Sequence, residues 1–194
     1  MRQAEAAGGG ASKLRDIGRN GARHLPALSA AHQVLLCQPG GTATLLTHLQ
    51  EARLLADAVS LLSYALPERE AVWWACMCVE QGAPDEFDPA QRQALLVTRE
   101  WVRSPGSATR TRCLHAAKDV GAVGAAAFAA RAAFAANLAS ASSLHAGRRV
   151  ERSVIEAAAA NGPERSLSRH ECFLLIGHDI AAGGGGRIQP GRRQ

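Results

Sequence analysis

Two cysteines stand close together in the most apolar stretch of the chain, and thiols are side chains that could bind a metal or do redox chemistry. Cys76 and Cys78 lie two positions apart in the run 71–79, which contains no charged residue. In a helix, residues i and i+2 point about 200° apart, so these two thiols cannot share a metal ion. Buried free cysteine packs as a small hydrophobic side chain. We therefore predict a structural role for both.

The histidines do not form a recognisable metal motif. The sequence contains seven, and none belongs to an HxxxH, HExxH or CxxCH pattern. Cys113 with His115 and His170 with Cys172 repeat the i, i+2 spacing, which is unfavourable for a shared metal ion on a helix. We expect His170 to be solvated in a first helical turn. A zinc site assembled from residues distant in sequence is the alternative.

Motifs for nucleophilic catalysis and phosphate binding are also missing from the sequence. There is no GxSxG. The run Gly40-Gly41-Thr42 precedes a predicted helix but lacks the lysine of a P-loop, so we interpret it as helix capping. The glycines at 183–186 follow a helix and are typical of a linker. No catalytic, cofactor-binding or metal-ligating residue is assigned, and no cofactor is expected.

The tryptophans are the most informative large side chains. Trp73 and Trp74 are adjacent, and adjacent helical positions diverge by about 100°. Burying both requires core on two sides, which is what we predict. The alternative is that one of them lies on an interaction surface, because tryptophan is enriched at interface hot spots. With Trp101, they are the candidate core or interaction anchors.

A helix over residues 67–81 is expected to carry these side chains. Pro67 suits a first helical position, and Glu68 and Glu70 complement the positive end of the helix dipole. A helix that is apolar all round belongs in a core, so we expect this one to be the most buried. It is predicted to pack against the apolar face of the preceding helix, at Leu55, Val59 and Leu62.

The other periodic segments also indicate helices. The segment 43–66 fits one long helix or two with a kink near Glu51, and 140–147 reads as a loop. No run of four or more residues alternates as a half-buried strand requires. We predict an all-α protein with about seven helices packed as antiparallel hairpins around residues 67–81. The remaining predicted helices cover residues 29–36, 88–103, 107–121, 124–139, 150–160 and 168–182.

Polar residues mark where several of these helices should begin. Asp88 with Gln91 and Ser168 with Glu171 have the spacing of a capping box. Thr42 is placed to cap the helix that follows it.

The charge of the chain is concentrated at its ends. The sequence has 194 residues and a formal net charge of +5. Residues 1–23 and 184–194 each carry +3, so the remainder is close to −1. We predict a basic disordered tail over 1–23, one helical domain over 24–183 and a flexible Gly/Arg tail over 184–194. Specific nucleic-acid binding is not expected, although loose contacts of the tails with polyanions are an alternative.

Cysteine usage indicates the compartment. Five cysteines, an odd number, and no opening hydrophobic signal segment favour reduced thiols and a cytoplasmic location. No apolar run approaches the roughly 18 residues that span a bilayer, so we expect a soluble protein without a transmembrane segment. Only Cys37, beside a predicted helix end, is expected to be reactive.

Residues 66–76, which read LPEREAVWWAC, carry a resemblance to a known family. With Ala56-Asp57-Ala58-Val59 and Trp101-Val102, they resemble a family of short proteobacterial proteins classed as a domain of unknown function. The resemblance is densest between Leu54 and Trp101. It implies a helical fold, a proteobacterial origin and an association with type VI secretion gene neighbourhoods. It implies no activity and no catalytic residue.

These patterns together favour a non-catalytic helical protein that interacts with a protein partner, as an accessory of a secretion apparatus such as type VI secretion. The alternative is a small enzyme whose site is assembled from residues distant in sequence. A deep polar pocket with converging titratable groups would favour the enzyme, and an exposed apolar groove would favour the interaction protein.

Overall fold

The fold was analysed in a computed structural model, which describes residues 12–18, 22, 25, 28–82, 87–136, 143–160 and 162–187. These residues form nine α-helices and one short 3-10 helix, and none of them forms a strand. The all-α prediction is confirmed, and the helix count is slightly higher than the expected number of about seven. In chain order they are α2 (Ala30–Leu36), α3 (Gly41–Glu51), α4 (Leu55–Ala65), α5 (Glu68–Gly82), α6 (Pro89–Arg103), α7 (Ser107–Val120), α8 (Ala125–Ala135), α9 (Ser143–Ala159), η1 (Pro163–Arg165) and α10 (Ser166–Ala181).

One break adds to the helix count. The periodic segment 43–66 is two helices, because α3 ends at Glu51 and α4 begins at Leu55. Between them Arg53 has φ +62°, a left-handed conformation that non-glycine residues rarely adopt. The guanidinium of Arg53 forms an ion pair with Glu171 of α10. The alternative of two helices is therefore the correct one.

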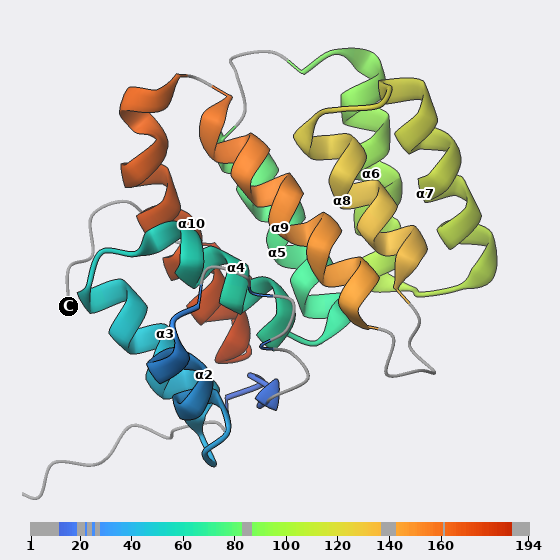
Figure 1. The fold of residues 1–194 in the computed structure, drawn as a ribbon. Helices are drawn as coiled ribbons and strands as arrows, with labels where there is room; N and C mark the ends of the chain where they lie inside the picture. The colour runs from blue at the N-terminus through green and yellow to red at the C-terminus, as the bar shows by residue number, and fades with distance from the viewer. Residues whose placement is uncertain are drawn as a thin grey trace, which may run out of the picture.

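Helix α5 occupies the middle of the molecule, as predicted for residues 67–81. It packs against α9, α10, α6 and α8, with α9 in front of it in Figure 1 and α6 to α8 to its right. The predicted packing of this helix against Leu55, Val59 and Leu62 of α4 is not among its main contacts. Helix α4 has its main contacts with α9, α10 and α3, so α9 and α10 are neighbours of both helices.

The expectation that α5 is the most buried helix is also wrong. Helix α4 buries eight of its eleven residues, whereas α5 buries nine of its fifteen. The reason is that polar residues at both ends of α5, such as Glu70 and Gln81, reach the surface. The polar residues of α4 are smaller, and buried Ser63 satisfies its hydroxyl by donating to the carbonyl of Val59 at 2.8 Å.

Helix α9 begins earlier than the sequence suggested. It starts at Ser143, not near Val150, so the predicted loop over 140–147 is wrong from Ser143 onward. The glycine that suggested a loop is a packing residue. A Cβ atom at Gly147 would lie 2.7 Å from Cδ1 of Tyr64 in α4, so glycine permits α4 and α9 to approach closely.

The predicted capping residues differ in outcome. The capping box of α6 is confirmed, because Gln91 N donates to Asp88 Oδ1 at 2.8 Å and Asp88 N donates to Gln91 Oε1 at 3.2 Å. The predicted box at Ser168 is wrong. Helix α10 begins two residues earlier, at Ser166, and the Ser168 hydroxyl donates to the carbonyl of Arg165.

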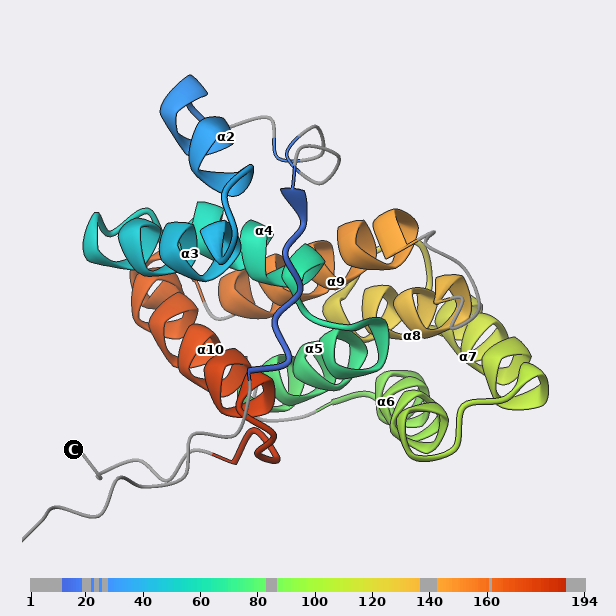
Figure 2. The same ribbon diagram turned by 90° about the horizontal axis from the view of Figure 1, so that it is seen from below.

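Residues 12–18 pack against the helices, contrary to the prediction of a disordered tail over 1–23. The segment crosses the molecule beside α4 and reaches the end of α10 (Figure 2), where Lys13 N donates to Ala181 O at 2.8 Å. Asp16 accepts the backbone N–H groups of Gly40 and Thr42 at the start of α3. The prediction that Thr42 caps this helix is wrong, because Gly40 is the N-cap residue and the remote carboxylate of Asp16 accepts the N–H groups at the helix start. Composition missed this packing because the segment is attached by only two larger apolar side chains, Leu14 and Ile17, together with hydrogen bonds to distant residues.

The first residues of the predicted C-terminal tail also contact the helices. Gly186 N donates to Asp179 Oδ2 at 2.7 Å, so residues 184–187 do not follow the prediction of a flexible tail. The predictions for 1–11 and 188–194 lie outside the described residues. Among the described helices, none is long and apolar enough to cross a membrane.

Candidate functional site

The three tryptophans occupy two different environments. Trp74 and Trp101 are buried, with 0% and 1% of their surface exposed. Trp74 also donates its indole N–H to the carbonyl of Phe173 at 2.7 Å, which satisfies its polar atom inside the core. Trp73 is only half-buried. The prediction that Trp73 and Trp74 are both buried in the core is therefore wrong for Trp73, which reaches the surface, and right for Trp74.

The exposed part of Trp73 lines a groove of about 350 Å³. This is the size of a site for a small ligand or a few side chains. The groove is built by α5, the end of α6, the end of α10 and the N-terminal segment. We call it the Trp73 groove, and its lining residues are Lys13, Arg69, Glu70, Trp73, Val102, Arg103, Ile180 and Gly184.

Contacts on two sides hold the Trp73 ring in place. Its Nε1 donates to the carbonyl of Gly185 at 3.1 Å. The guanidinium of Arg99 lies over the ring at 5.4 Å from the ring centroid, a favourable cation–π geometry. Arg99 is fixed in turn by an ion pair with Glu80. The indole is thus oriented before any ligand arrives, which lowers the entropy lost on binding.

The rim of the groove is basic. The lining contains three cationic side chains and only one carboxylate. The cations are Lys13, Arg69 and Arg103, and the carboxylate is Glu70. That carboxylate already accepts from Lys13 Nζ at 3.0 Å. Arg69 donates Nε to the carbonyl of Val102, which orients the rest of its guanidinium. Arg103 is exposed and forms no ion pair with a described residue. A ligand with an apolar group and a carboxylate would match this lining.

The cysteines are distributed largely as expected. Cys76, Cys78 and Cys113 are buried and Cys37 is exposed. Burial raises the pKa of Cys113 to about 11 and raises the pKa of Cys76 and Cys78 strongly, so their thiolates are disfavoured. Cys172 is half-buried, and burial raises its pKa as well.

The histidines also differ from expectation in one place. His170 is buried, with 8% of its surface exposed, because α10 begins at Ser166 and so places His170 beyond the first turn. Burial lowers the pKa of His170. His178 contacts Gln50 through Nε2 at 2.9 Å, and burial lowers its pKa as well. Within the described part of the chain, no group of three or more His, Cys, Asp or Glu residues is placed to hold a metal ion.

Sequence reasoning identified Trp73 but not its neighbours in the groove. Lys13, Arg103 and Gly184 are distant in sequence and meet only because α5, α6 and α10 converge. Arg69 was recognisable only as part of the resemblance. The one available signal was that the adjacent Trp73 and Trp74 must diverge by about 100° on a helix.

The fold and the groove define an all-helical protein with a preformed, basic-rimmed surface groove and no recognised catalytic motif. Residues 45–181 match the sequence model of a family of unknown function, DUF6931. The chain therefore belongs to this family, which confirms the resemblance to a domain of unknown function. No curated protein and no solved structure matches the chain.

Proposed function

We propose that this protein is a non-catalytic interaction protein that binds a segment of a partner protein in the Trp73 groove. The observation that carries the proposal is the position of Trp73, half-buried and pre-oriented at a groove. A partly desolvated tryptophan in a pocket is a typical interface hot spot. The apolar floor at Val102 and Ile180 and the three cations around it favour a segment that presents an apolar side chain beside a carboxylate.

The enzyme alternative has one supporting observation, since the groove does assemble residues from distant positions. Its described titratable groups, however, are three cations and Glu70, which is already paired with Lys13. A general base needs an available acceptor within reach of the substrate. The lining is thus better suited to recognising an anion than to acid–base catalysis.

The resemblance noted above makes components of a type VI secretion apparatus the first partners to test. The role we propose is that of an accessory protein, which would hold or present another component without chemical turnover. A bacterial cytoplasmic location belongs to the same proposal.

The test is affinity capture from the native host with four versions of the full-length protein. Wild type and Arg92→Glu should capture the same partner, because Arg92 is an exposed arginine on α6 that is absent from the groove lining. Trp73→Ala and Arg103→Glu should capture much less of the partner, with a loss of about tenfold or more as is usual for hot-spot positions. Thermal melts of each variant would exclude unfolding as the cause. Equal capture by all four would reject the groove as the binding site, and a bound metabolite that turns over would favour the enzyme.

A further inference from the structure

A second surface of the molecule is strongly basic although the helical domain as a whole is not. Residues 24–183 carry 14 basic and 15 acidic residues, which suggested a neutral body. The segment 99–152 alone carries nine basic residues against three acidic ones, a net of +6. The segments 24–98 and 153–183 carry −5 and −2, which cancels this excess. The total charge therefore conceals a segregated distribution.

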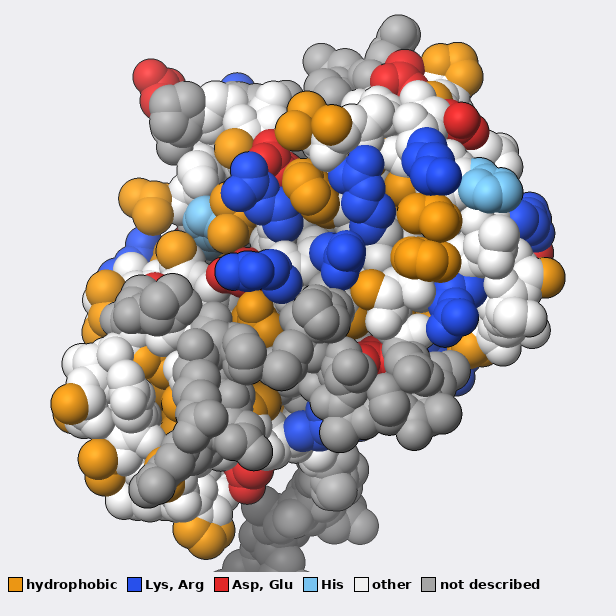
Figure 3. All heavy atoms as spheres, turned by 45° about the vertical axis from the view of Figure 1, so that its right-hand side comes forward, with side chains coloured by type: hydrophobic (Ala, Val, Ile, Leu, Met, Phe, Trp, Pro, Cys, Tyr) orange, Lys and Arg blue, Asp and Glu red, His pale blue; other side chains and the backbone are white. Residues whose placement is uncertain are grey.

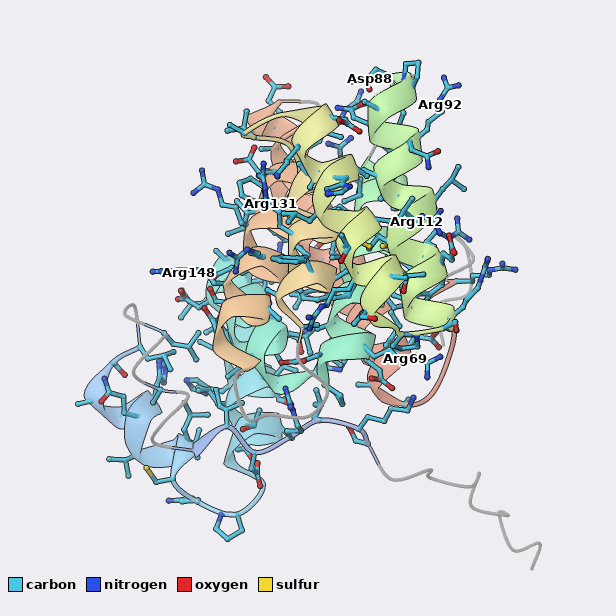
Figure 4. The ribbon with its side chains drawn as sticks, turned by 90° about the vertical axis from the view of Figure 1, so that its right-hand side faces the viewer. Arg69, Asp88, Arg92, Arg112, Arg131 and Arg148 are labelled. Atoms are coloured by element: carbon cyan, nitrogen blue, oxygen red, sulfur yellow. The ribbon has the colours of Figure 1, made fainter. Side chains whose placement is uncertain are left out.

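The structure gathers much of this charge on the outer face of α7, α8 and α9. Figure 3 shows Lys and Arg side chains there with hydrophobic side chains between them. In Figure 4, Arg131 on α8 and Arg148 on α9 lie on the same side of the molecule, away from Arg69 of the Trp73 groove. We call this region the Arg–Phe surface, and it consists of Arg110, Phe128, Arg131, Phe134, Arg148 and Arg152.

Aromatic rings hold several of the guanidinium groups in position. Arg131 and Arg152 both lie over the Phe128 ring, each 5.6 Å from its centroid. Arg110 lies over Phe134 at 5.9 Å. Arg131 is fixed further, because it donates to the carbonyls of Gly121 and Ala122 beyond the end of α7. Ordered arginines lose less side-chain entropy when they bind a carboxylate.

The acidic neighbours neutralise only part of the charge of this surface. Glu151 accepts from the Ser60 hydroxyl and from Tyr64 OH, so its carboxylate is directed toward α4. Glu156 pairs with Arg152 Nε at 3.3 Å and is the ion-pair partner that the structure records on this face. Neither Arg110 nor Arg148 forms an ion pair with a described residue.

The surface is also hollowed and partly apolar. A groove of about 530 Å³ runs beside Phe128, and its other lining residues are three arginines, one carboxylate and one apolar residue: Arg148, Arg149, Arg152, Glu151 and Ile155. Phe134 and Ile155 expose 37% and 38% of their surface. A partner that offers both carboxylates and apolar side chains would match these features, as a bare polyanion would not.

We propose that the Arg–Phe surface binds an acidic segment of a partner protein in which apolar side chains stand between the carboxylates. Nucleic acid fits less well, because guanidinium groups already lie over the rings of Phe128 and Phe134, which leaves less of each ring for base stacking. The exposed Ile155 and Phe134 also have no counterpart in a phosphate backbone. With the Trp73 groove, this surface would let the protein bridge two partners.

The test is a fluorescence-anisotropy titration of the full-length protein with a short peptide that combines glutamates with Leu and Phe. Binding should weaken as salt is added. Arg148→Glu should weaken it about tenfold, and Phe134→Ala should weaken it without changing the salt dependence. Arg92→Glu, the same change on α6, should leave it unchanged. Arg148 is exposed and forms no ion pair with a described residue, so its variant should fold normally.

Several outcomes would overturn this proposal. They are no binding of the peptide, equal effects of Arg148→Glu and Arg92→Glu, or equally tight binding of polyglutamate. Tighter binding of single-stranded DNA or of phosphatidylserine vesicles would assign the surface to those ligands. Salt-sensitive self-association that Arg148→Glu abolishes would assign it to the acidic part of a second copy. Trp73→Ala should leave peptide binding intact, so this inference and the proposed function can fail separately.

Discussion

At the scale of single residues, the adjacent Trp73 and Trp74 are predicted to contribute differently to stability. Trp74 is enclosed by the core and Trp73 borders the groove. Trp74→Ala should lower the free energy of unfolding by about 3–5 kcal/mol, the usual range for a large buried aromatic side chain. Trp73→Ala should lower it by only about 1–2 kcal/mol, since only part of its area leaves water. Urea denaturation of both variants measures the difference, and equal losses would contradict these assignments.

The buried histidine predicts a dependence of stability on pH. Burial lowers the pKa of His170, and its Nε2 has no hydrogen-bond partner among the described residues. The unfolded chain, with a histidine pKa near 6.5, then binds protons more readily than the folded one. Stability is therefore retained above that pH and lost as the pH falls below it.

His170→Gln should reduce this acid sensitivity. The melting temperature of wild type should fall more between about pH 7.5 and pH 5.5 than that of the variant, because the variant has no imidazole to protonate at this position. Part of the fall should persist in the variant, since burial also lowers the pKa of His178. Identical pH profiles for the two proteins would show that His170 does not contribute.

At the scale of helices, a carboxylate from a distant segment begins α3. Asp16 accepts the N–H groups of Gly40 and Thr42 at 3.0 and 3.4 Å. Asp16→Ala should cost about 1 kcal/mol, as for loss of a helix cap. Differential scanning calorimetry should show a lower melting temperature for this variant. The control Asp119→Ala should melt at the wild-type temperature, because Asp119 is an exposed residue on α7. An unchanged melting temperature for Asp16→Ala would mean that the Asp16 carboxylate does not stabilise α3.

The glycine in α9 is predicted to matter through packing. Alanine normally stabilises a helix relative to glycine by about 1 kcal/mol. At Gly147 a Cβ atom would lie 2.7 and 2.9 Å from Cδ1 and Cε1 of Tyr64, so Gly147→Ala should instead destabilise by about 1–3 kcal/mol. The loss should shrink when Tyr64→Ala is added, a non-additivity that a double-mutant cycle measures. Stabilisation by Gly147→Ala alone would contradict the close contact.

Helix positions were more predictable from the sequence than helix boundaries. The Asp88–Gln91 capping box marked the start of α6 because both partners are local in sequence. The start of α3 depends on Asp16, 24 positions before Gly40. The first part of α9 contains Gly147, which is required there because Tyr64 of α4 packs against it. Interactions between distant segments override local propensity, and a single sequence does not display them.

At the scale of the whole molecule, two distinct surfaces distinguish this protein from a featureless helical bundle. The Trp73 groove was only partly predictable, since its anchor is visible in the sequence and its walls come from three distant regions. The Arg–Phe surface was missed because charge was summed over the domain. Residues 99–152 carry nine basic and three acidic residues, and this local imbalance was the sequence signal that could have predicted the surface.

The central claim, that a partner protein occupies the Trp73 groove, is tested most directly by acrylamide quenching of tryptophan fluorescence with the captured partner added. Trp74 and Trp101 are buried, so quenching in the free protein should come mainly from Trp73. A partner without tryptophan, or with its own replaced by phenylalanine, should reduce quenching in wild type and have little effect in Trp73→Phe. Quenching of wild type that stays unchanged at saturating partner would contradict the claim.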